Sequence, residues 1–260
     1  MIYQVLDVVL QAAALVDGMG ANVVKLTVGT VIKNFSDRSN IGFKPIGVLE
    51  TVVDVGQRSV KRFVWLFFLA GSVATALEEH GFIYNGFKNA NLSLDGQAGI
   101  TGSGLLRLTN ITQLTMTSHA FHPKPFQFKN LSSNGSTLSF STTFVFAIVP
   151  KYSDLSGPGI CFVIAPSRSL PGALPTQYLG LFNYTSNGDP SNHVVAVELD
   201  TIVNKEFGDI NDNHVGIDLN NLRSAISAPA KYYLDRTGGN YKNLSLISGQ
   251  QMQVWIEYAL

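Results

Sequence analysis

Hydrophobic and polar residues alternate in short runs through the last two thirds of the chain. Val195, Val197 and Leu199 alternate with Glu198 and Asp200, which gives the period of two that is typical of a β-strand. Such a strand buries one face and turns both carboxylates the same way off the other. The pattern therefore predicts a strand that carries two neighbouring acidic side chains.

Further short runs with the composition of strands flank this one. Residues 93–109, 136–149 and 159–166 are rich in Thr, Phe, Val and Ile, and Gly, Pro, Asn and Ser separate them. These residue types favour strands and turns, respectively. No long helical period is present after residue 81, so we expect one all-β sandwich over residues 77–260.

The first 57 residues have a different pattern. Residues 5–16, VLDVVLQAAALV, predict an amphipathic helix, whereas residues 25–35 and 46–56 are short apolar runs without a motif. We assign no function to residues 1–57. We hypothesise that they derive from an upstream start or an unspliced part of the gene model.

A basic and then apolar segment follows. Arg58, Lys61 and Arg62 precede the apolar residues 63–76, which end in the small residues Ala-Thr-Ala. This is the layout of a secretory signal peptide, which we place at residues 58–76. A transmembrane anchor is the alternative, but the apolar core is short for a span of about 20 residues.

Glycosylation sequons are dense after this segment. Six asparagines begin Asn-x-Ser/Thr sequons: Asn91, Asn110, Asn130, Asn134, Asn183 and Asn243. Several such acceptors after a signal peptide predict a secreted glycoprotein with an exposed surface. We therefore expect passage through the secretory pathway to the plasma-membrane surface or the extracellular space.

Composition excludes some functions. The 18 basic and 18 acidic residues give a net charge of zero, and Lys and Arg do not cluster, so the electrostatic pattern of a nucleic-acid-binding protein is absent. The single Cys161 forms no internal disulfide, and its apolar context indicates a buried, unreactive thiol. His119 and His122 are interpreted as packing or surface residues.

Oxygen-rich side chains follow the acidic strand. Asn204, Asp209 and His214 come after Glu198 and Asp200. Carboxylate, amide and carbonyl oxygens suit Ca²⁺, and one imidazole added to carboxylates suits a Mn²⁺-like ion. The alternative is a solvated acidic face followed by an Asn- and Asp-rich turn.

An EF-hand is excluded by spacing. If Asp209 began such a loop, His214 would stand where the sharp turn needs Gly, and Asn220 where a bidentate Glu is needed.

The order of these residues within VAVELDT and HVGIDLN resembles the metal-binding signature of the legume (L-type) lectins. The resemblance implies that Glu198, Asp200, Asp209 and His214 hold Mn²⁺. It also implies that Asp200, the Ile202 carbonyl, Asn204 and Asp209 hold Ca²⁺. Two cations would offset the repulsion between the crowded carboxylates and order the loop.

The resemblance extends from about Phe82 to the last residue and is strongest to the lectin ectodomain of plant L-type lectin-domain receptor kinases. FIYNGF, NLSLDGQAGI, FSTTFVFAIVP and LPTQYLGLFN carry it. It implies a concanavalin-like jelly-roll sandwich with a flat back sheet, a curved front sheet, and a homodimer formed through the back sheet. Relatives continue beyond a strand like VWIEYAL with further strands, a transmembrane helix and a kinase. The domain is therefore expected to be C-terminally incomplete, with open apolar edges and no membrane contact except through that later segment.

The expected sugar site departs from the family pattern. Pro158 stands where legume lectins place an Asp that accepts sugar hydrogen bonds, and proline offers neither a side-chain acceptor nor an N–H. Ile202 stands where an aromatic often stacks on the sugar. ALPTQYLG around Tyr178 replaces a Gly-rich loop, and Asn204 is retained. We predict a weakened sugar site.

Three functions follow. The preferred one is carbohydrate binding by a non-enzymatic domain with a Ca/Mn loop, and the runner-up is a metal-ordered module that binds peptide or an apolar ligand. The third is a glycoside hydrolase, because related jelly-roll glucanases use a Glu-x-Asp strand. Glu198 and Asp200 supply its start, but Ile202 and Val203 occupy the places of the second Glu that this chemistry needs.

Overall fold

The computed structural model describes residues 8–11, 25–31, 81–109, 116–126, 139–152, 156–233 and 241–259. The chain divides into a unit of Met1–Lys33 with Ile83–Leu260 and a second unit of Asn34–Phe82, and most of the second unit lies outside the described residues. The described elements are strands and two short 3-10 turns, which confirms the all-β class. The expected signal peptide at 58–76 also lies outside the described part.

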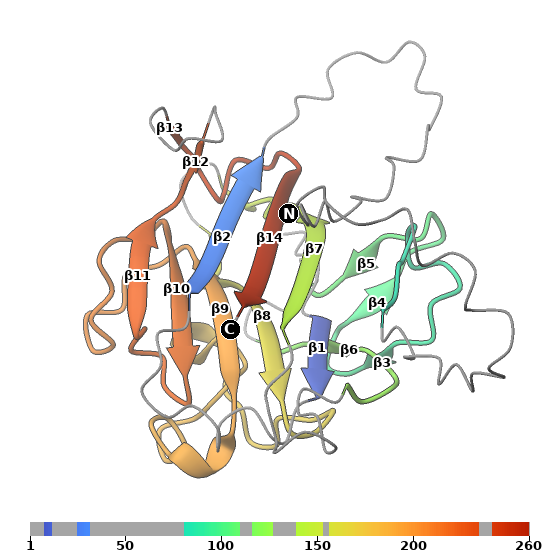
Figure 1. Cartoon of the computed structure of the whole chain (residues 1–260), viewed down its shortest axis with the longest axis horizontal. Coiled ribbons are helices and arrows are strands. Elements are labelled where there is room, and N and C mark those ends of the chain that lie inside the picture. Colours follow the sequence, from blue (N-terminus) through green and yellow to red (C-terminus); the bar gives the residue numbers. More distant parts are fainter. Residues whose placement is uncertain are drawn as a thin grey trace, which may run out of the picture. The chain divides into compact units, whose positions relative to one another are not determined.

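The larger sheet has seven strands (Figure 1). Their order across the sheet is β11 (Ile226–Pro229), β10 (His214–Leu219), β9 (Val195–Asp200), β8 (Gly159–Ala165), β1 (Val8–Gln11), β6 (Ala120–Phe121) and β3 (Ser93–Leu94). Strands β8, β9, β10 and β11 are antiparallel neighbours. The acidic strand β9 therefore lies inside the sheet, where both of its edges are hydrogen-bonded.

The second sheet contains β2 (Lys25–Val31), β14 (Met252–Ala259) and β7 (Phe140–Phe146), with β14 in the middle. Two short pairs complete the description: β4 (Gly99–Ile100) with β5 (Leu106–Arg107), and β12 (Lys231–Tyr233) with β13 (Tyr241–Asn243). The 3-10 turns are η1 (Thr176–Tyr178) and η2 (Pro190–Asn192).

The two sheets pack face to face through aromatic side chains. The rings of Phe140 and Phe144 on β7 lie 6.4 and 6.3 Å, respectively, from the ring of Phe162 on β8. All residues of β8 after Gly159 are buried, including Cys161, as its apolar context predicted. Burial of aromatic and β-branched side chains between the sheets supplies the main stabilisation of the sandwich.

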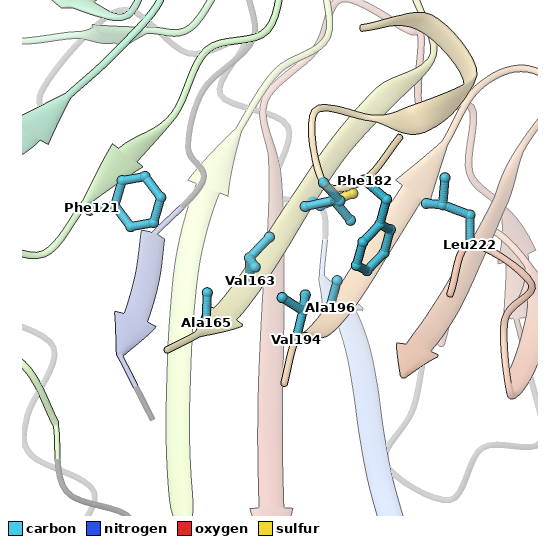
Figure 2. Close-up of a cluster of buried hydrophobic side chains, with 9 residues drawn as sticks. Phe121, Val163, Ala165, Phe182, Val194, Ala196 and Leu222 are labelled. Carbon is cyan, nitrogen blue, oxygen red and sulfur yellow. The ribbon is translucent and has the colours of Figure 1, made fainter. Parts of the chain in front are cut away.

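A second buried cluster lies on the other face of the larger sheet (Figure 2). Phe121, Val163, Ala196, Phe182 and Leu222 are among its members. Leu170, Tyr178, Leu179 and Phe207 pack against it from loops. The cluster therefore fixes the loops beside the acidic strand to the sheet.

One expectation for the N-terminal segment is wrong. Residues 8–11, expected in a helix, form β1 and pair in parallel with β8 and β6. Their β-branched valines suit a strand, and pairing with other segments outweighs the local helical pattern. On the other sheet, β14 pairs with β2 along one side and with β7 along the other.

No helix within the described residues has the length and apolar character needed to cross a membrane.

Candidate metal centre

The site is built by the pairing of β9 with β10. His214 lies opposite Asp200, and Gly216 lies opposite Glu198. Because residues two apart point to the same face of a strand, the carboxylates of Glu198 and Asp200 and the imidazole of His214 converge. One ligand atom from each of these three residues lies within 4.8 Å of the others. This spacing is compatible with coordination of a single cation.

The three side chains are buried. Glu198 and His214 are 1% exposed and Asp200 is 3% exposed, so the alternative of a solvated acidic face is wrong for this strand. All six residues of β9 are buried rather than only the alternate apolar ones. The loops that follow β8 and β10 cover the second face, which the sequence pattern of β9 alone does not reveal.

His214 is oriented as a metal ligand requires. Its Nδ1 donates to the Asn211 carbonyl oxygen at 2.7 Å, and its Nε2 faces Glu198 Oε1 at 3.3 Å. A backbone acceptor on one ring nitrogen fixes the tautomer that presents the other nitrogen to a metal.

The pKa values of two candidate ligands at this site are raised. Burial raises the pKa of Asp200 to about 7, with a smaller contribution from the charge of Glu198 and an opposing hydrogen bond from the Ile202 N–H. Burial lowers the pKa of His214, but the hydrogen bond and charge of Glu198 outweigh it, so the pKa is raised. A cation here would displace protons and offset the repulsion.

The loop after β9 is held by its own acidic groups. Asp200 Oδ1 accepts from the Ile202 N–H at 2.6 Å, and Asp209 Oδ2 accepts from the Asn204 N–H at 2.5 Å. The side-chain oxygen of Asn204 is buried without a hydrogen-bond partner. An orphaned buried oxygen is costly unless something binds it, so this donor set fits a cation such as Ca²⁺.

Asp209 lies at the edge of this arrangement. It is absent from the group of three whose ligand atoms lie within 4.8 Å, although burial raises its pKa and His214 and Glu198 act on its charge. Asp209 and His214 both line a pocket of about 130 Å³, with Arg223 and Ser224. Asp209 thus shares a pocket with His214 but lies outside the cluster of three.

The structure brings two polar residues to the site that the sequence pattern did not single out, Asp218 and Ser224. Asp218, buried on the same face of β10 as His214, has one oxygen without a partner. The Ser224 hydroxyl oxygen lies within hydrogen-bond distance of both acidic groups, 2.5 Å from Glu198 Oε1 and 2.9 Å from Asp218 Oδ1. In β10, His214, Gly216 and Asp218 alternate with apolar residues. This alternation is the sequence signal that places Asp218 on the same face as His214.

The residues expected at the sugar site are dispersed over three loops. Pro158 is half-buried, and its carbonyl oxygen accepts from the Thr201 N–H at 3.1 Å. The ring of Tyr178 packs edge-on against Phe207, with the ring centres 5.6 Å apart. Ile202 is half-buried, and its N–H donates to Asp200 Oδ1.

Three of the sequon asparagines are described. Asn91 and Asn243 are exposed, whereas Asn183 is half-buried and its Nδ2 donates to the Gly172 carbonyl oxygen at 3.0 Å. Asn110, Asn130 and Asn134 lie outside the described residues.

Residues 79–260 match the family model of the legume lectin domain, which is more than half of the chain. The chain belongs to the legume lectin family. Membership confirms the resemblance and, together with the two packed sheets, the jelly-roll class. The domain is of the carbohydrate-binding lectin type, and this family match is to a binding module rather than a catalytic one.

Curated relatives are plant receptor kinases. The L-type lectin-domain containing receptor kinase IV.1 of Arabidopsis thaliana is 54% identical over 179 residues, which cover 68% of this chain and 26% of the relative. The receptor kinase SIT1 of Oryza sativa subsp. japonica is 50% identical over 199 residues, covering 74% of this chain and 29% of the relative. This chain therefore spans less than a third of the length of these relatives.

Among solved structures, lectin II from Ulex europaeus is 24% identical, with a TM-score of 0.49, over 65% of this chain and 84% of that chain.

Proposed function

We propose that this legume lectin domain binds a glycan at a plant cell surface, through a loop ordered by Ca²⁺ and a Mn²⁺-like ion, with a weakened sugar site. The observation that carries the proposal is the buried convergence of Glu198, Asp200 and His214 inside a legume lectin domain. A bound cation would offset the charge of these buried carboxylates.

Two ligand sets are proposed for the cations. Glu198, Asp200, Asp209 and His214 would hold the Mn²⁺-like ion, which suits their mixture of oxygens and one nitrogen. Asp200, the Ile202 carbonyl, Asn204 and Asp209 would hold Ca²⁺, which suits oxygens alone. The orphaned oxygen of Asn204 supports the second set.

Bound cations would supply positive charge that fixes the loop between β9 and β10, residues 201–213, here called the metal loop. The hydrogen bonds from the Ile202 and Asn204 N–H groups to Asp200 and Asp209 already bend this loop. The ring of Phe207 in this loop packs against the ring of Tyr178 in the neighbouring loop that follows β8. Metal binding would therefore set the shape of the surface on which a sugar lies.

The weakness of the sugar site is inferred from Pro158 and Ile202. At Pro158 the backbone oxygen is already engaged by Thr201, and the side chain offers no polar group to a hydroxyl. Ile202 offers no aromatic face. Tyr178 and Asn204 remain as candidate contacts.

The remaining assignments are part of the same proposal. The receptor-kinase relatives support a location in the secretory pathway and at the cell surface, with a signal peptide at 58–76 and glycans on the exposed sequons. The outer face of β7 and β14, where Val145 and Glu257 are exposed, is proposed as the back-sheet surface of a homodimer.

The runner-up is a metal-ordered module for a peptide or an apolar ligand. Exposed Val203 and Ile210 in the metal loop favour it, because they are 44% and 48% exposed, respectively, beside the site. Glycoside hydrolysis is less well supported, because Glu198 and Asp200 are both buried. In addition, Ile202 and Val203 occupy the positions at which this chemistry needs a second Glu.

Binding to a plant-glycan array, with competition by free monosaccharides and with chelator, separates these functions. The lectin proposal predicts glycan binding that sugars inhibit and that chelator abolishes. Binding of peptides without sugar inhibition would favour the runner-up. Release of reducing sugar from β-glucans, lost in Glu198→Gln, would favour the enzyme.

A further inference from the structure

The ring of His119 joins two distant parts of the chain. His119 Nδ1 lies 2.8 Å from Asp95 Oδ1 and 3.0 Å from Asp95 Oδ2. Its Nε2 lies 2.7 Å from the carbonyl oxygen of Gly180. The residue is 3% exposed, so water does not compete freely for these contacts.

Both partners of the ring are acceptors. A carboxylate faces one ring nitrogen and a carbonyl oxygen faces the other, so both nitrogens must carry hydrogen for the two bonds to form. The ring then bears a positive charge beside the carboxylate of Asp95, which strengthens both bonds. The arrangement is a hydrogen-bonded bridge between distant segments rather than ordinary core packing.

The backbone fixes the Asp95 end of this bridge. The His119 N–H donates to Asp95 Oδ1 at 2.9 Å, and the Asp95 N–H donates to the His119 carbonyl oxygen at 3.0 Å. Of these four contacts between the same two residues, the two from the ring and the one from the His119 N–H hold the carboxylate in place.

Gly180 fits the other end closely. Its φ is +74°, and a Cβ there would lie 3.2 Å from His119 Nε2 and 3.4 Å from the side chain of Thr117. A glycine therefore allows the carbonyl oxygen to approach the buried ring.

Gly180 belongs to a compact segment of residues 174–182, here called the Tyr178 loop. Within it, the Gly180 N–H donates to the Leu174 carbonyl oxygen at 3.0 Å, and the Leu174 N–H donates to the Phe182 carbonyl oxygen at 2.8 Å. Tyr178 from this loop contacts Phe207 of the metal loop. Fixing Gly180 thus fixes a loop that borders the candidate metal centre.

We propose that His119 is a positioning residue for the ligand site, holding the Tyr178 loop through a doubly protonated ring bridged to Asp95. The role of this loop in recognition rests on the proposed function. The bridge itself does not, because it can be measured without any sugar.

The test compares hydrogen exchange in the wild-type chain with that in His119→Gln and Asp95→Asn. In His119→Gln the side chain retains a donor at only one end of the bridge. Asp95→Asn removes the charge of a carboxylate whose side chain is 43% exposed, so we expect this variant to fold. We expect the Leu174 and Gly180 amides to exchange about tenfold faster or more in both variants.

His122→Gln is the matched control. His122 is also buried, at 9% exposed, but its Nδ1 lies 2.8 Å from the Lys124 carbonyl oxygen, within its own turn. Exchange in the Tyr178 loop should be unchanged in this variant.

A spectroscopic readout separates the bridge from simple packing. In wild-type protein with ¹⁵N-labelled histidine at neutral pH, His119 should give the signals of a ring protonated on both nitrogens, and Asp95→Asn should weaken that state. A neutral ring in the wild type, or Leu174 and Gly180 exchange within twofold of wild type in both variants, overturns the proposal.

A glycan array run with the same variants separates the two proposals. Loss of glycan binding in His119→Gln and Asp95→Asn, with His122→Gln unaffected, supports the positioning role. Absence of glycan binding in the wild type contradicts the proposed function but leaves the exchange result as a test of the bridge. Wild-type affinity in variants with a released loop overturns the positioning role.

Discussion

Gly216 lies directly opposite Glu198 in the β9–β10 ladder, and no space for a methyl group exists between them. A Cβ on Gly216 would overlap both Glu198 Oε1 and the hydroxyl of Ser224. The absence of a side chain at this position is therefore what allows the carboxylate to turn toward Asp200 and His214.

Gly216→Ala should consequently disrupt the site. We expect a loss of about 1–3 kcal/mol in the free energy of unfolding, because the interior is close-packed, together with loss of metal affinity. Urea denaturation and isothermal titration with Mn²⁺ measure these. Gly99→Ala is the control, since Gly99 is also in a strand but has nothing within 4 Å of its Cβ position. Equal effects in the two variants would contradict the argument.

The stability of the metal-free protein should fall as pH rises. Asp200 has a pKa of about 7 against an ordinary value of 3.8, so between these values the folded state keeps a proton that the unfolded state releases. His214, whose pKa is raised above 6.5, extends the fall to higher pH. The slope per proton is at most about 1.4 kcal/mol per pH unit.

Denaturation in chelator from pH 4 to 8 measures this slope. Asp200→Asn should flatten it. Adding Ca²⁺ and Mn²⁺ should stabilise the protein more at pH 8 than at pH 5, since the metals bind deprotonated ligands. Metal-free stability that rises across the same range would contradict the prediction.

The two cations should respond to different substitutions. Asn204→Ala removes the orphaned oxygen and should weaken Ca²⁺ binding about tenfold or more, whereas His214→Gln should weaken Mn²⁺ binding most. Direct metal titrations measure both. Asp212→Asn removes an exposed carboxylate from the same loop and should change neither affinity. If Asn204→Ala leaves Ca²⁺ affinity at the wild-type value, the calcium ligand set is wrong.

Pro158→Asp should increase affinity for free monosaccharides. It adds an acceptor at the position where legume lectins place one, while the backbone oxygen that binds the Thr201 N–H is retained. Calorimetric titration with a panel of simple sugars measures the change. Pro158→Ala is the matched control, because it removes the ring without adding an acceptor. An equal gain in both variants would show that the acceptor is not the cause.

Glycans should be found on Asn91 and Asn243 of a mature chain that begins near Leu77. Both side chains are exposed, whereas the Nδ2 of Asn183 is hydrogen-bonded to Gly172, so we expect lower occupancy at Asn183. Peptide mass spectrometry of the protein expressed in plant cells measures occupancy and the N-terminus. Bare sequons at both exposed positions, with residues 1–57 still attached, would contradict this prediction.

The sequence alone determined the class of the fold and the candidate ligands. Alternation in β9, the β-rich composition after residue 81 and the order of Glu198, Asp200, Asn204, Asp209 and His214 are local properties, so they can be read without coordinates. The family resemblance rested on those residues and on the motifs from Phe82 onward, and the match over residues 79–260 bears it out.

Only the tertiary structure decided how deep the site lies and what surrounds it. The pattern of β9 predicted one open face, yet all six residues of the strand are buried. Asp218 and Ser224 join the site because β10 and the turn after it return to β9, and His119 reaches Gly180 across 61 positions of sequence. Such contacts depend on strand pairing and loop packing between distant segments, which local periodicity does not encode.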